Sequence, residues 1–181
     1  MAYPGWGRGA EVVDVVEDVG IEGGVVVGHD GSQCAQEALR WAAGLARRAD
    51  LDLHVVRAWA MTTAPQPSTW VAGYVPPIAD YEKAVLDELG HHVAAAGLDP
   101  AVRVTCHAVH KPPVASLIAA GERAHLLVVG ARGRGGFTGL LLGSVSNQLV
   151  HHAACPVTVV RTGVSNAFAE VADAGTAPSA G

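Results

Sequence analysis

Short runs of valine and leucine recur along this chain, and segments with helical spacing of apolar residues separate them. The predicted strands are residues 23–30, 51–59, 101–109, 125–130 and 156–161. The predicted helices are residues 32–49, 78–96, 112–121 and 143–153. A strand that is apolar on both faces needs helices on both sides of its sheet, and strands that alternate with helices run parallel. The sequence therefore predicts an α/β fold with a five-stranded parallel sheet between two helical layers.

The length of 181 residues fits one domain with an extension at each end. All the predicted strands and helices fall within residues 23–161. Residues 1–22 are expected to be a flexible N-terminal extension, although the valines of "EVVDVVEDV" could lie against the domain as a short helix or strand. Residues 162–181 have the composition of a flexible tail.

Composition and charge restrict the class of protein. Half of the residues are hydrophobic and 16% are charged, which is enough apolar material for a substantial core. A net charge of −5 argues against nucleic acid or an anionic membrane as a partner. No apolar run reaches the roughly 18 residues of a membrane span, and acidic residues stand where a signal peptide would be apolar. Three scattered cysteines indicate no disulfide framework, so we expect a soluble protein of the reducing cytoplasm.

A glycine-rich segment, "GARGRGGFTGLLLGSVSNQ" at residues 130–148, joins the fourth predicted strand to the fourth helix. Its early glycines can take left-handed backbone angles, so that successive N–H groups curl into an anion-binding nest. These glycines are Gly130, Gly133, Gly135 and Gly136. Arg132 and Arg134 could add positive charge at the rim of such a site.

The end of the same segment, "GSVS" at residues 143–146, is expected to start a helix. Unpaired N–H groups and the helix dipole favour phosphate at such a position. The hydroxyls of Ser144 and Ser146 can donate further hydrogen bonds. The whole segment therefore predicts a polyphosphate site.

A second candidate loop, "GHDGS" at residues 28–32, follows the first predicted strand. Ligands of parallel sheets bind beyond the carboxyl ends of the strands, where the strand order reverses. If the first and fourth predicted strands are neighbours, this loop and the glycine-rich loop face one crevice. Asp30 could contact the ligand there, or it could cap the first helix together with Ser32.

The chain resembles the universal stress protein family in three separated motifs. The spacing Gly130-x2-Gly133-x9-Gly143-Ser144 is similar to the nucleotide-binding signature of that family, and "VVVGHDGS" and "CPVTVVR" look like its first and last strands. The resemblance covers roughly residues 23–161. It implies a Rossmann-like, three-layer α/β/α fold that binds ATP or a related adenine nucleotide.

The resemblance also implies roles for particular residues. The glycine-rich segment would contact ribose and phosphates, Asp30 would face the ribose or a phosphate-bound metal, and Val55 would meet adenine through its backbone. The complete expected binding set is Gly28, His29, Asp30, Val55, Val129, Gly130, Gly133, Arg134, Gly143, Ser144, Val145 and Ser146. The chain departs from the family pattern at His125, where an aspartate is common, and at His110-Lys111, where a glycine-containing turn is common.

Other phosphate and hydrolase chemistries fit the sequence less well. The chain has no G-x-x-x-x-G-K-[ST] and no G-x-S-x-G, and its two lysines, Lys83 and Lys111, lie outside the glycine-rich segment. Histidines that adjoin on a helix point about 100° apart, so the pairs at 91–92 and 151–152 predict no metal site.

The prediction is therefore a stress-response or regulatory protein that binds ATP, either alone or with Mg²⁺, without fast turnover. A slow ATPase of the same fold stays open as an alternative. An interaction module with a vestigial pocket and a binder of ADP, AMP or cyclic AMP are further alternatives. Residues 156–161 would be a short apolar edge strand opened by Pro156, and we expect a homodimer in which two such strands pair antiparallel.

Overall fold

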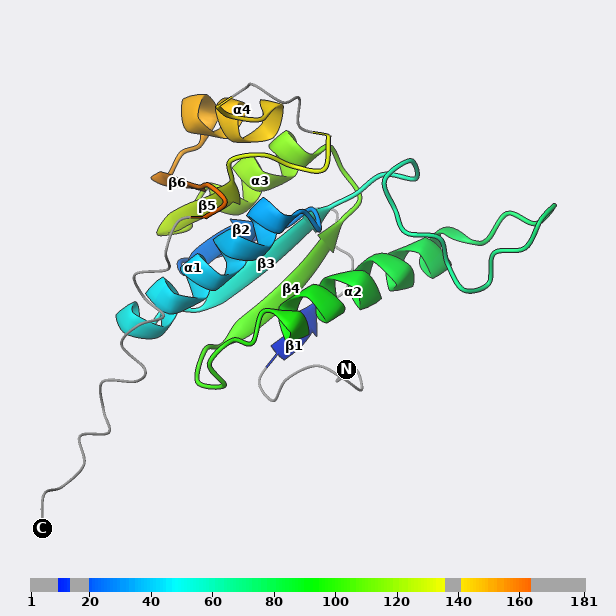
Figure 1. Ribbon diagram of the computed structural model, residues 1–181, viewed down its shortest axis with the longest axis horizontal. Helices are drawn as coiled ribbons and strands as arrows, with labels where there is room; N and C mark the ends of the chain where they lie inside the picture. The colour runs from blue at the N-terminus through cyan, green and yellow to red at the C-terminus, as the bar shows by residue number, and fades with distance from the viewer. Residues whose placement is uncertain (1–9, 14–19, 136–140, 164–181) are drawn as a thin grey trace, which may run out of the picture.

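The computed structural model describes residues 10–13, 20–135 and 141–163 (Figure 1). Its strands are β1 (Ala10–Val13), β2 (Val25–Gly28), β3 (Leu53–Ala58), β4 (Val104–Val109), β5 (Leu126–Gly130) and β6 (Val157–Val160). Its helices are α1 (Gln33–Ala49), α2 (Ile78–Ala95), α3 (Pro113–Gly121) and α4 (Ser144–His152). Gly136 and most of the two predicted extensions lie outside the described residues.

The strands of the described sheet pair in parallel, in the order β1-β4-β3-β2-β5-β6. The five strands from β2 to β6 are the five predicted ones, and the α/β fold is confirmed. β1 adds a sixth strand from the segment treated above as an extension, with Ala10 beside Val104 and Val13 beside His107 of β4. Four residues are too few to establish a hydrophobic period, which is why the sequence left a strand here only as an alternative.

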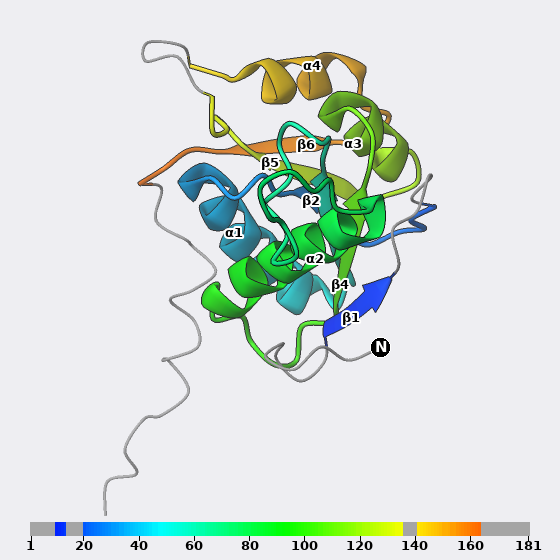
Figure 2. The same cartoon turned by 90° about the vertical axis from the view of Figure 1, so that its right-hand side faces the viewer.

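Both faces of the sheet are buried, because successive residues of a strand point to opposite sides. Val25 and Val27 of β2 pack in one core cluster with residues of α1 and α2. Val26 packs in a second cluster with residues of α3 and α4. The two pairs of helices lie on opposite sides of the sheet (Figure 2) and complete the three layers.

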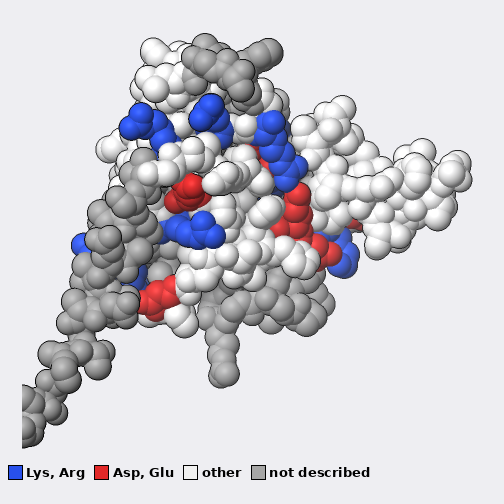
Figure 3. All heavy atoms as spheres, viewed as in Figure 1, with Lys and Arg blue, Asp and Glu red and all other residues white. Residues whose placement is uncertain are grey.

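Residues 60–77, which join β3 to α2, form an arm that projects from the domain (Figure 1). The arm contains no Asp, Glu, Lys or Arg and stands out as an uncharged protrusion in Figure 3. Several large apolar side chains are exposed on it: Met61, Trp70, Val71, Tyr74 and Val75. Within the described residues, no helix combines the length and apolar composition that crossing a membrane requires.

Candidate functional site

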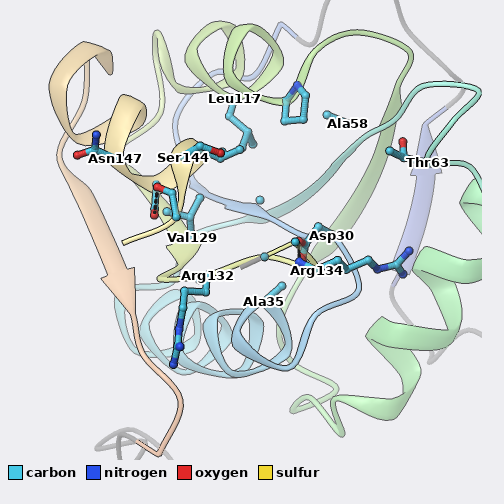
Figure 4. A pocket seen from close by; sticks show the side chains of 18 of the residues that line it. Asp30, Ala35, Ala58, Thr63, Leu117, Val129, Arg132, Arg134, Ser144 and Asn147 are labelled. Carbon is cyan, nitrogen blue, oxygen red and sulfur yellow. Dashed lines mark hydrogen bonds between the residues drawn. The ribbon is translucent and has the colours of Figure 1, made fainter. Parts of the chain in front are cut away.

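A cavity of about 1040 Å³ lies at the carboxyl ends of three neighbouring strands (Figure 4). Gly28 ends β2, Ala58 ends β3 and Gly130 ends β5, and all three residues line it. β2 pairs directly with β5. The loop after β2 and the glycine-rich loop after β5 therefore face one crevice, as predicted from the sequence.

Most of the expected binding residues come together in this cavity. Its lining includes Gly28, Asp30, Val129, Gly130, Gly133, Arg134, Gly143, Ser144, Val145 and Ser146. His29 and Val55 are not part of the lining. The sequence reasoning did not include Ala35, Arg57, Ala58, Thr62, Thr63, Ala64, Pro113, Leu117, Leu141, Leu142 and Asn147, which also line the cavity.

The start of α4 forms one wall of the cavity. Its N-cap residue, Gly143, has extended backbone angles and supplies no side-chain cap, and its own N–H donates to the carbonyl of Ala131 at 2.7 Å. The first N–H groups of a helix have no acceptor within the helix. Those of Ser144 and Val145 are therefore available to an anion, next to the exposed hydroxyl of Ser144.

Ser146 plays a different part from the one predicted. Its side chain is buried, and its hydroxyl lies 3.0 Å from the carbonyl oxygen of Ala131 and 3.1 Å from that of Gly143. A hydroxyl has a single hydrogen to donate. Ser146 thus donates to the backbone and ties the start of α4 to the residue that follows β5, and donation from this hydroxyl to phosphate stays a prediction.

Two of the described glycines of the loop are needed for space, and the described ones have no left-handed backbone angle. None of Gly130, Gly133, Gly135 and Gly143 has a positive φ. A Cβ on Gly130 would lie 2.8 Å from the carbonyl carbon of Cys34, and a Cβ on Gly133 would collide with the carboxylate of Asp30. The predicted nest conformation is therefore not observed at Gly130, Gly133 and Gly135, while its fourth predicted member, Gly136, lies outside the described residues. Close approach of α1 explains Gly130, and close approach of the Asp30 carboxylate explains Gly133.

Asp30 connects the two loops. Its Oδ1 accepts a hydrogen bond from the N–H of Ser32 at 3.0 Å, and its Oδ2 accepts one from the N–H of Arg134 at 3.0 Å. Burial would raise the pKa of Asp30, but these hydrogen bonds outweigh burial and hold the pKa below its usual value. The capping of α1 falls to Ser32, whose hydroxyl accepts from the N–H of Ala35.

His29 supports this loop from outside the cavity. Its buried ring accepts a hydrogen bond from the N–H of Gly31 through Nδ1 and lies 3.1 Å from Gln36 Oε1 through Nε2. Burial lowers the pKa of His29 to about 4, so the ring is neutral at physiological pH. The ring of His29 is therefore occupied by protein partners outside the cavity lining, and contact of His29 with a nucleotide stays a prediction.

Val55 also lies away from the cavity. It sits in the middle of β3, fully buried, beside Val27 of β2 and Cys106 of β4. The backbone of a strand paired on both sides is occupied by the sheet ladder. Ala58, at the end of β3, takes the position at the cavity that was expected of Val55. The sequence signal that could have located Ala58 is its place near the carboxyl end of the second predicted strand.

Three arginines line the cavity, Arg57 from β3 and Arg132 and Arg134 from the glycine-rich loop. Arg57 at the end of β3 is buried, and its Nη2 lies 3.2 Å from Oε2 of Glu88 on α2. Burial lowers the pKa of Arg57, and Glu88 opposes that shift. Arg134 of the glycine-rich loop lines the cavity, but its side chain points toward α2 (Figure 4) and also binds Glu88.

The family model for the universal stress protein family matches residues 24–161. The chain belongs to the universal stress protein family. A universal stress protein of Mycobacterium tuberculosis is 36% identical over 144 residues, which are 76% of this chain and 47% of the relative. A universal stress protein of Mycobacterium bovis is 34% identical over 150 residues, again 76% of this chain and 47% of the relative. The chain thus spans about half the length of these relatives.

Solved structures give the same fold. The universal stress protein UspA from Lactobacillus plantarum has a TM-score of 0.57 at 21% identity, over 77% of this chain and 97% of that one. A universal stress protein in complex with cAMP has a TM-score of 0.51 at 28% identity, over 77% of this chain and 95% of that one.

Proposed function

We propose that this chain binds an adenine nucleotide, ATP foremost, and acts in regulation or stress response without fast turnover. The observation that carries the proposal is the cavity itself, in which the open start of α4 faces the loop held by Asp30. Its volume of about 1040 Å³ slightly exceeds the roughly 300–1,000 Å³ typical of ligand pockets, so the cavity has room for a nucleotide. The similar universal stress protein solved in complex with cAMP supports an adenine nucleotide as the ligand.

The chemistry of the lining gives the proposed nucleotide a direction. The phosphates would lie against the N–H groups of Ser144 and Val145 and the hydroxyl of Ser144, where the dipole of α4 is favourable. The base would lie near apolar side chains at the opposite wall, among them Ala58 and Leu117. This orientation leaves the ribose beside Asp30.

Asp30 is the single carboxylate among the described residues of the lining. Each of its oxygens already accepts one backbone N–H. An ionised carboxylate has about four acceptor positions, so it retains capacity for the ribose hydroxyls. The same oxygens are the proposed contact for Mg²⁺ carried in on the phosphates, because Mg²⁺ prefers oxygen ligands.

Among the described residues the lining contains no lysine, and this favours nucleotide binding over hydrolysis. Among the described residues, neither Lys83 nor Lys111 lines the cavity, so no lysine there is placed to neutralise a γ-phosphate. Cyclic AMP is the second candidate ligand, because the structure with a TM-score of 0.51 holds it. ADP and AMP fit the same donor groups.

We further propose a homodimer through β6. This strand ends the described sheet, and Val157 and Val159 on it are partly exposed. A second copy that supplies the same strand antiparallel would cover the open edge. We also propose a cytoplasmic location, because Cys34, Cys106 and Cys155 are all unpaired.

Two measurements test the proposal. The protein purified under native conditions is examined by mass spectrometry for bound nucleotide, and calorimetry then compares ATP, ADP, AMP and cyclic AMP. We expect ATP to bind most tightly and phosphate release to stay below about one turnover per hour. Tightest binding of cyclic AMP would transfer the proposal to that ligand, and fast release of phosphate would make the protein an ATPase. No binding of any of the four would refute the proposed function.

Sedimentation equilibrium at micromolar concentration tests the dimer. A monomer there would refute the β6 interface, and substitution of Val159 by lysine should convert a dimer to a monomer.

A further inference from the structure

We propose that Glu88, on α2 and outside every binding motif, is a positioning residue for the cavity. Its carboxylate joins the buried arginine at the end of β3 to the arginine of the glycine-rich loop. The first test of this inference, ATP affinity, rests on the proposed nucleotide binding. The second test, hydrogen exchange of the ligand-free protein, does not.

The Glu88 bridge, Arg57–Glu88–Arg134, shares one carboxylate between two guanidinium groups. Oε2 of Glu88 lies 3.2 Å from Nη2 of Arg57, and Oε1 lies 2.7 Å from Nη2 of Arg134. The Arg57 side chain is 5% exposed, against 26% for Glu88 and 47% for Arg134. The bridge therefore runs from the interior to the surface, and Glu88 is the charge that keeps the two arginines together.

The outer end of the bridge holds the glycine-rich loop in place. The backbone N–H of Arg134 donates to Asp30, while its side chain is held by Glu88. That side chain crosses the loop after β2 so closely that a Cβ on Gly31 would collide with the guanidinium. Gly31 has a φ of +83°, so both the close passage and the backbone angle favour glycine. Arg134 is thus held by two hydrogen bonds, one to Asp30 and one to Glu88, and of these two partners only Glu88 lies outside the two loops.

The inner end of the Glu88 bridge is Arg57, and its burial is the reason that loss of Glu88 would change the cavity. Arg57 lines the cavity, is buried, and its Nε has no hydrogen-bond partner among the described residues. Without the Glu88 carboxylate, Arg57 and Arg134 would be two neighbouring positive charges in a partly buried site with Asp30 as the remaining carboxylate close to them, and the exposed Arg134 side chain would move away. Movement of Arg134 would carry residues 132–135 and the Asp30 contact with it. The geometry of the cavity wall therefore depends on Glu88.

The test compares Glu88→Gln with Asp87→Asn. Asp87 is the preceding residue on α2 and pairs on the surface with Lys83, one helical turn away. We expect Glu88→Gln to weaken ATP affinity about tenfold by calorimetry and Asp87→Asn to leave it unchanged. Arg134→Gln should cost about the same as Glu88→Gln, and the double variant should be no worse than either single one, because all three break the same bridge. Equal affinity in Glu88→Gln and wild type, or additive losses in the double variant, would overturn the inference.

Hydrogen exchange of the ligand-free proteins gives a readout that needs no nucleotide. Glu88→Gln and Arg134→Gln should speed exchange in peptides covering 30–35 and 131–135, with the core strands β2 and β3 unchanged. Unchanged exchange in those two peptides would overturn the inference even if ATP binds. If the wild-type protein binds no adenine nucleotide, only the proposed function is refuted. If Glu88→Gln does not fold, Arg134→Gln carries both tests, because it removes only the exposed end of the bridge.

Discussion

Substituting Gly130 by alanine tests why the glycine-rich loop begins with a glycine. The Cβ of the new residue would lie 2.8 Å from the carbonyl carbon and Cβ of Cys34 and 2.9 Å from the N of Ala35. Ordinary contact begins at 3.4 Å, and the neighbouring atoms are mostly backbone of the first turn of α1, which cannot rotate aside. α1 must therefore move away from β5 by roughly half an ångström, which loosens the packing between them.

The expected loss of stability follows from overpacking, which typically costs about 1–3 kcal/mol. Alanine is better than glycine in a strand by about 0.5–1 kcal/mol, which offsets part of the loss. We therefore expect the free energy of unfolding to fall by about 1–2 kcal/mol. At about 2–4 °C per kcal/mol for a chain of this size, the Tm should fall by roughly 2–8 °C.

The assay is thermal and urea unfolding of Gly130→Ala beside Gly135→Ala. A Cβ on Gly135 meets nothing within 4 Å, so this control should stay within about 0.5 kcal/mol of wild type. A wild-type Tm for Gly130→Ala would refute the close approach of α1 to β5. An equal loss in both variants would show that the loop needs glycine for its backbone angles after all.

Three further predictions concern ligand contact and acid stability. Ser144→Ala should weaken ATP affinity about tenfold in calorimetry by removing a charge-assisted hydrogen bond, while Val150→Ala, on an exposed part of α4, should not change it. Gly143→Ala should leave the Tm near that of wild type, because the nearest atom to its Cβ would be 3.4 Å away and its φ is −76°. Burial lowers the pKa of His29 and of His107 to about 4 from the ordinary 6.5, so the unfolded chain binds protons first as the pH falls. Each histidine therefore costs stability between about pH 6.5 and pH 4, at a slope of roughly 1 kcal/mol per pH unit, and urea midpoints that stay level from pH 7 to pH 5 would contradict this.

The fold could be predicted from the sequence because its signals are local. Runs such as "VVVG" at β2 and "LLVVG" at β5 are apolar without interruption, and their order with the helices leaves a parallel sheet as the solution. The pairing of β2 with β5, which brings the two loops together, follows the same topology. The four residues of β1 carry no comparable pattern, so that strand could only be left as an alternative.

The site was predicted less completely because contacts depend on where each strand ends and what lies across from it. Val55 was predicted to contact the ligand, whereas Ala58, three positions later on β3, lines the cavity. The sheet register that decides this is not encoded in the strand's own residues. The burial of Ser146 depends on how α4 docks on β5. Glu88 is 46 residues from Arg134 in sequence, and only the packing of α2 brings the two together.

The position of β1 has a consequence for the order in which the sheet assembles. β1 pairs with β4, about ninety residues later in the chain, and a pairing that distant forms slowly because a long loop must close first. β2, β3 and β4 can pair without it. While β1 is undocked, β4 is an open edge of six residues that a strand of another chain could occupy. Docking of β1 therefore covers four of those six residues and leaves β1, a strand of four residues, as the edge of the described sheet opposite β6. A shorter edge offers less backbone for folding intermediates to pair with one another there.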